Sequence, residues 1–121
     1  MALLHALPGQ PIDVAPLGPA LAHSASHAIL KTRALELMRI VLRRGTTLPK
    51  HSVYGERVFH CLEGVVAVDA AEHSCELRAH QLLLLPARQA YSLRAVEDTS
   101  LLMTVQLPPG QPGSASSTSA G

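Results

Sequence analysis

The most chemically suggestive stretch of the sequence runs from His51 to Gly64 and reads HSVYGERVFHCLEG. It contains two His and two Glu, residue types that bind divalent metals through neutral nitrogen or anionic oxygen. It also contains Arg57, whose guanidinium has no lone pair for a metal and keeps its positive charge. A guanidinium instead matches a carboxylate or a phosphate. The stretch is therefore open to two kinds of chemistry, metal binding and anion binding.

The composition limits the class of protein. A length of 121 residues suits one domain, and 47% hydrophobic residues allow a core that must be aliphatic, because there is one Phe and no Trp. A net charge of +1 with no basic run argues against nucleic-acid and anionic-membrane partners. Cys61 and Cys75 lack metal or disulfide spacing, and the N-terminus lacks the basic region of a secretory signal. We expect a soluble, cytoplasmic protein with free thiols.

Three zones differ in composition and predict the organisation of the chain. Residues 1–26 form an arm with four prolines, in which Ile12–Val14 could be a short edge strand exchanged between subunits. Residues 27–107 hold short apolar segments separated by turn residues, which is typical of an all-β barrel or sandwich. Residues 108–121 are rich in Pro, Gly and Ser without charge, and we expect a disordered tail.

The segment 34–44, ALELMRIVLRR, fits either a helix or a strand. At helical spacing Leu35, Met38 and Leu42 group on one side, whereas with period two Met38, Ile40 and Leu42 share a face. Periodicity alone slightly favours the helix. We predict a strand because of a family resemblance in the residues that follow.

Residues 45–91 resemble the two signature motifs of the cupin superfamily. Gly45, His51 and the closing LEG that ends at Gly64 fit the first motif. HQLLLLPARQAYSLRA fits the second motif, with Pro86 in its proline position. The resemblance implies a single small cupin-type jelly-roll β-barrel for residues 27–107, and it implies that the protein pairs as a homodimer.

The metal ligands of the family carry over poorly. Metal-binding cupins supply three His and one Glu, and His51 is the one ligand that matches. The remaining ligand positions hold Val53, Arg57 and Tyr91, and Glu56 lies one residue too early. Since Arg57 would repel a cation, we predict a degenerate metal motif, with no metal and no cofactor.

Two turn glycines of the second motif are also replaced, by His80 and Arg88. His visits the left-handed backbone region more readily than most residues, so His80 is tolerable at a turn. Arg88 instead suggests a locally different turn. Two further charged residues have structural interpretations, since we expect Glu63 to shape a hairpin and Arg39 to lie at a sheet edge or an interface.

Strand alternation predicts which side chains face the barrel interior. If His51 points inward, as the resemblance implies, then Arg57, Phe59 and Cys61 also point inward. We therefore predict a metal-free pocket for a small polar or anionic molecule, lined by His51, Arg57, Phe59 and Tyr91. The simpler alternative is that Arg57 pairs with an internal carboxylate and that side chains fill the cavity.

Two other functions stay open. The first is a metal-dependent enzyme of dioxygenase or isomerase type with non-standard ligands, in which a β-bulge near Gly55 brings Glu56 to His51 and His60. Related sugar-nucleotide epimerases use a His/Tyr acid–base pair, which His51 and Tyr91 resemble, so the sequence leaves open whether the protein is an enzyme. The second is a structural dimeric module without a ligand.

Overall fold

The computed structural model describes residues 7–51, 54–71 and 73–109. These residues form one short 3-10 helix, η1, and nine β-strands. The bounds are η1 Gly18–His23, β1 His27–Lys31, β2 Leu35–Leu42, β3 Thr47–His51, β4 Arg57–Glu63, β5 Val65–Ala70, β6 His73–Arg78, β7 Leu82–Leu85, β8 Tyr91–Ala95 and β9 Thr99–Gln106. Among the described residues, no helix has the length and apolar character that crossing a membrane requires.

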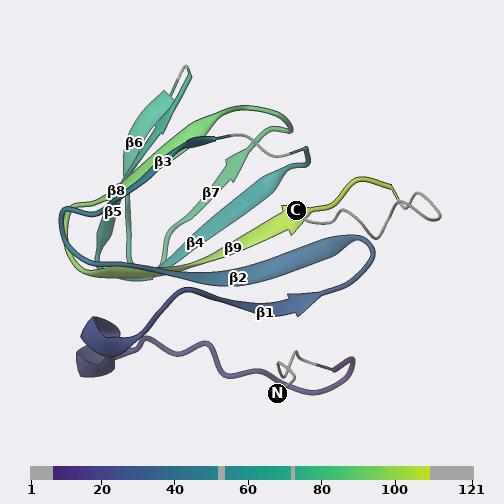
Figure 1. The fold of residues 1–121 in the computed structure, drawn as a ribbon, viewed down its shortest axis with the longest axis horizontal. Coiled ribbons are helices and arrows are strands. Elements are labelled where there is room, and N and C mark those ends of the chain that lie inside the picture. The colour runs from purple at the N-terminus through teal and green to yellow at the C-terminus, as the bar shows by residue number, and fades with distance from the viewer. Residues whose placement is uncertain (1–6, 52–53, 72, 110–121) are drawn as a thin grey trace.

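Two antiparallel sheets face each other and enclose the core (Figure 1). The five-stranded sheet has the order β1-β2-β9-β4-β7, and the four-stranded sheet has the order β3-β8-β5-β6. Strands that are neighbours in a sheet are often distant in sequence. For example, β9 lies between β2 and β4. This arrangement confirms the all-β jelly-roll class that the sequence predicts.

The ambiguous segment is strand β2. It pairs with β1 on one side and with β9 on the other, so its backbone groups are satisfied by neighbouring strands. Ile40 and Leu42 are buried in the main core, and Met38 packs against it. The period-two pattern therefore decides the structure, because tertiary pairing on both edges outweighs the local helical spacing.

Apolar side chains form two clusters on opposite faces of the five-stranded sheet. The main core between the sheets is aliphatic apart from Phe59 and Tyr91. A smaller cluster of Ile29, Leu62 and Leu102 lies on the outer face. The N-terminal arm runs beside β1 (Figure 1), and its Val14 packs against this outer cluster.

The edge strand expected at Ile12–Val14 is absent from the described chain, in which these residues have no regular structure. Pro11 and Pro16 flank the segment, and proline cannot donate a ladder hydrogen bond. The arm is held instead by packing of Val14 and by the helix η1. Its exchange between subunits stays a prediction.

Four turn positions of the two motifs share one backbone conformation. Gly45 and Gly64 have φ angles of 84° and 86°, and His80 and Arg88 have φ angles of 75° and 66°. The replaced glycines of the second motif therefore keep the left-handed geometry that glycine adopts without strain. Arg88 keeps a positive φ at this position, and the locally different turn that we expected there stays a prediction.

Candidate functional site

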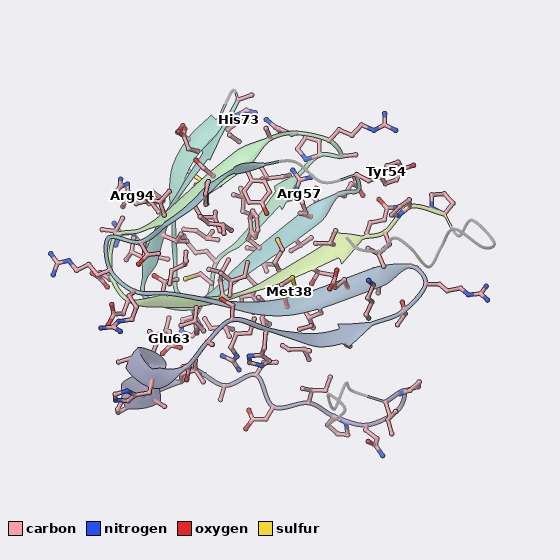
Figure 2. The ribbon with its side chains drawn as sticks, in the orientation of Figure 1. Met38, Tyr54, Arg57, Glu63, His73 and Arg94 are labelled. Carbon is pink, nitrogen blue, oxygen red and sulfur yellow. The ribbon has the colours of Figure 1, made fainter. Side chains whose placement is uncertain are left out.

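Arg57, Phe59 and Tyr91 converge between the two sheets. Arg57 and Phe59 lie two residues apart on the same face of β4, and Tyr91 begins β8 in the opposite sheet. The rings of Phe59 and Tyr91 meet edge to face with centroids 5.3 Å apart, and the Cζ atom of Arg57 lies 5.1 Å from the Tyr91 centroid. All three side chains have 0% exposure. The inward direction that strand alternation predicts for Arg57 is therefore correct (Figure 2).

The buried guanidinium of Arg57 connects two loops. Its Nη1 donates to the carbonyl oxygen of Gly55 at 3.0 Å, and its Nη2 donates to the carbonyl oxygen of Gln89 at 2.5 Å. Gly55 lies between β3 and β4, and Gln89 lies between β7 and β8. Burial lowers the pKa of Arg57, while the nearby Tyr91 raises it. Hydrogen bonds to carbonyls and the Tyr91 ring offset the cost of burying this charge.

The hydroxyl of Tyr91 lies in a weakly polar environment. It donates to the Sδ atom of Met103 at 3.4 Å. Burial raises the pKa of Tyr91, and the charge of Arg57 acts in the opposite direction. A raised pKa keeps the phenol protonated near neutral pH, and its complete burial keeps a substrate from reaching it. Acid–base catalysis by Tyr91 would require the barrel to open.

Among the described residues, the remaining predicted ligands do not form a group that could hold a metal. His51 ends β3 and its backbone lies opposite Tyr91, but its side chain falls outside the described part of the chain. Glu56 is exposed, and His60 alternates with the inward-facing Phe59 and Cys61 on β4. β4 pairs regularly with β9 from Arg57 to Cys61, and the β-bulge near Gly55 that would shift Glu56 stays a prediction.

The described residues contain no group of three or more His, Cys, Asp or Glu side chains that could hold a metal. Arg57 also places a positive charge where the resemblance expects a carboxylate ligand. These residues therefore do not fit the metal of the cupin family. We assign no chemical step to a metal.

A groove of about 540 Å³ lies at the mouth of the barrel, beside the Arg57 layer. Its walls come from the β1–β2 turn, the β3–β4 loop, the β7–β8 loop and the segment after β9. The lining residues are Arg33, Ala34, Tyr54, Ala87, Arg88, Gln106, Leu107, Pro108 and Pro109. In Figure 2, Tyr54 marks this end of the barrel and Arg94 marks the opposite end.

The groove is positively charged. Arg33 and Arg88 line it, and no acidic residue is among its described lining residues. Within the described residues the one ion pair within 4 Å joins Arg78 and Glu76, so neither groove arginine has a carboxylate partner there. The Cζ atom of Arg88 lies 5.1 Å from the ring centroid of Tyr54. Both guanidiniums are thus available to an anion.

Gly55 joins the groove to the interior layer. Its carbonyl accepts the hydrogen bond from Arg57, and a Cβ atom at this position would overlap the backbone of Gln106. The amide of Gln106 also donates to the carbonyl of Glu56 at 3.0 Å. The β3–β4 loop therefore packs directly on the end of β9, and Arg57 supports the groove wall from beneath.

A second polar cluster, which sequence reasoning missed, attaches the arm to the sheet. The Glu63 carboxylate accepts hydrogen bonds from the amides of Leu17 at 2.8 Å and Gly18 at 3.0 Å, and from the hydroxyl of Ser100. The buried Arg39 lies near enough to affect its titration. Burial by itself raises the pKa of Glu63. The three hydrogen bonds and the charge of Arg39 together lower it by more, so the pKa lies below its usual value.

The roles expected for Glu63 and Arg39 are therefore incomplete. Glu63 does precede the β4–β5 turn, yet its side chain reaches back to the arm across more than 40 residues of sequence. Arg39 is 5% exposed and lies on β2 inside the sheet, not at its edge. The sequence did contain a signal for this cluster, because Arg39 and Glu63 are charged residues within segments that are otherwise rich in apolar side chains.

Comparison with known proteins identifies the fold. No protein-family model and no curated protein matches the sequence. A conserved protein of unknown function from Streptococcus pyogenes superposes with a TM-score of 0.70 at 19% identity, over 91% of this chain and 100% of that one. A cupin superfamily protein from Desulfitobacterium hafniense DCB-2 superposes with a TM-score of 0.69 at 12% identity, over 89% and 100%.

A third solved structure, an RmlC-like cupin protein from Desulfovibrio desulfuricans, gives a TM-score of 0.62 at 19% identity, over 88% of this chain and 96% of that one. These identities are low, and the likeness therefore concerns the fold. The chain has the cupin fold, in the form of a small β-barrel. The degenerate metal motif stays a prediction from the sequence.

Proposed function

We propose that this cupin-fold protein binds a small anionic molecule without a metal, in the groove at the mouth of the barrel. The observation that carries the proposal is the pair of groove arginines, Arg33 and Arg88, that have no carboxylate within 4 Å among the described residues. Two such guanidiniums near apolar walls favour an anion with an apolar body.

A cytoplasmic location of the protein stays a prediction.

The interior residues have an indirect role in this proposal. His51, Arg57, Phe59 and Tyr91 were predicted to line the pocket, and the last three are fully buried. In the described arrangement Arg57 is a positioning residue that ties the β3–β4 and β7–β8 loops together through Gly55 and Gln89.

A structural module without a ligand is the second candidate. It is favoured by the filled interior and by Leu82 and Leu84, which are 65% and 60% exposed on the edge strand β7. Exposed leucines on neighbouring positions of one strand face suit a contact with another protein surface. A metal-dependent enzyme with non-standard ligands stays an untested alternative, and elemental analysis of untagged, purified protein tests it.

A thermal-shift screen of carboxylates and sugar phosphates distinguishes the first two candidates. We expect at least one anion to raise the melting temperature of the wild type, and Arg88→Gln to reduce that rise. The matched control is Arg94→Gln, which removes an exposed arginine at the far end of the barrel (Figure 2). If no anion stabilises the wild type, or if Arg94→Gln weakens the response equally, the binding proposal is wrong.

A further inference from the structure

The two groove arginines lie at opposite ends of the groove. Arg33 lies in the turn before β2, and Arg88 lies in the loop after β7. In the five-stranded sheet, β9 and β4 separate β2 from β7. The register places these strand ends side by side, because Leu35 pairs with Gln106, and Arg57 pairs with both Val105 and Leu85.

The length of the groove follows from the sheet geometry. Three steps between neighbouring strands separate β2 from β7. At about 4.8 Å per step, the backbone positions at the two ends are roughly 14 Å apart. The guanidinium of Arg88 lies over Tyr54, the residue that leads into β4, so its charge reaches back along the groove. This backbone separation favours an elongated ligand with a charge at each end, because the two arginines approach the groove from different sides.

Apolar groups lie between the two charges. Leu107, Pro108 and Pro109 follow β9, which is central in the sheet, and they line the groove. The amide of Leu107 donates to the carbonyl of Ala34 at 2.8 Å, which fixes this apolar segment beside the Arg33 turn. The groove therefore has the pattern cation, apolar wall, cation across the ends of the strands.

We propose that the groove binds an elongated dianion of the α,ω-dicarboxylate class, with one carboxylate at Arg33, the other at Arg88 and an apolar spacer over the segment after β9. This inference rests on the proposed function, because it specifies the anion that the same groove binds. It differs in requiring two charges at a fixed separation. A short dicarboxylate or a monocarboxylate satisfies one arginine at a time.

Isothermal titration calorimetry with three probes tests the spacing. Sebacate has the chain length of decanoate with a second carboxylate, and succinate has two carboxylates on a short spacer. We expect sebacate to bind the wild type up to about fivefold more tightly than decanoate or succinate, which is the upper range of the effect of one exposed ion pair. Arg33→Gln and Arg88→Gln should each remove this advantage, and Arg94→Gln should retain it.

The outcomes separate this inference from the proposed function. If decanoate binds as tightly as sebacate, or if the sebacate advantage survives in both groove variants, the dianion proposal is wrong and anion binding stands. If none of the probes binds and the anion screen is also negative, both proposals are wrong. Arg33 and Arg88 are exposed, so their Gln variants should fold, and a circular dichroism melt confirms this before titration.

Discussion

The guanidinium of Arg57 lies over the ring of Tyr91, with its Cζ atom 5.1 Å from the ring centroid, and the two residues come from different sheets. The contact lies between β4 of the five-stranded sheet and β8 of the four-stranded sheet. Arg57 also donates to the carbonyls of Gly55 and Gln89. One side chain therefore closes the barrel interior and positions two loops of its mouth.

Replacing Arg57 with alanine should lower the free energy of unfolding by about 3 kcal/mol or more, because it leaves a cavity and two carbonyls without their donor. Urea denaturation measures the loss. The exposed Arg94→Ala is the control and should change stability by less than about 0.5 kcal/mol. Equal stability of the two variants would contradict the structural role of Arg57.

Replacing Glu63 with glutamine should destabilise the protein at neutral pH by about 1–2 kcal/mol, since the carboxylate accepts charge-assisted hydrogen bonds from Leu17, Gly18 and Ser100. The pKa of Glu63 is lowered in the folded state. Its stabilisation is therefore fully present above the unfolded value of about 4.3 and is lost as the pH falls through the lower folded value.

Denaturation of wild type and Glu63→Gln at a series of pH values checks this dependence. The difference in unfolding free energy between the two proteins should shrink as the medium becomes more acidic than about pH 4. Glu97→Gln, at an exposed position in the β8–β9 turn, is the control and should follow the wild type. A constant difference across the acid range would show that the charge of Glu63 is unimportant.

Replacing Arg88 with glycine should separate stability from binding. Arg88 has a φ angle of 66°, a conformation that strains most side chains. Glycine removes the strain, and the net gain should be up to about 1 kcal/mol after the added freedom of the unfolded chain. Anion binding should fall because the groove loses one of its cations.

His80→Gly is the matched control for Arg88→Gly. His80 has a φ angle of 75° at the other replaced motif glycine, and it does not line the groove. This variant should gain similar stability and keep full anion affinity in calorimetric titration. If both variants lose affinity equally, the loss does not come from removing a groove cation, and the binding role of Arg88 is contradicted.

The homodimer expected from the sequence can be tested through β7. Leu82 and Leu84 are exposed on this edge strand. If this face takes part in dimerisation, Leu84→Lys should convert a dimer into a monomer, because a lysine would have to be buried in the interface. Light scattering at micromolar concentration measures the mass of the particle. A monomeric wild type would contradict the homodimer prediction.

Much of the fold could be predicted from the sequence because the motif turns constrain it. Gly45, Gly64 and the positions of His80 and Arg88 all have positive φ angles, so the register of the resemblance holds even where glycine is replaced. The strand nature of residues 35–42 followed from the same register. The local pattern alone would have favoured a helix, since it contains no information about pairing with β1 and β9.

The candidate site was less predictable. Strand alternation correctly places Arg57 and Phe59 in the interior, but it does not show whether a cavity remains beside them. The groove combines turn residues such as Arg33 and Arg88 that are more than 50 residues apart in sequence. The contact of Glu63 with Leu17 and Gly18 is similarly distant, and neither can be found by local spacing.

The hydrogen bonds of Arg57 also limit how this barrel can evolve. A single change to glutamate would restore the carboxylate of the family motif, but it would first remove the donor that both mouth loops depend on. The intermediate would be less stable before any ion could compensate, and Val53 and Tyr91 would still lack imidazoles. Building the metal ligands of the family resemblance into this barrel would therefore need several replacements at once.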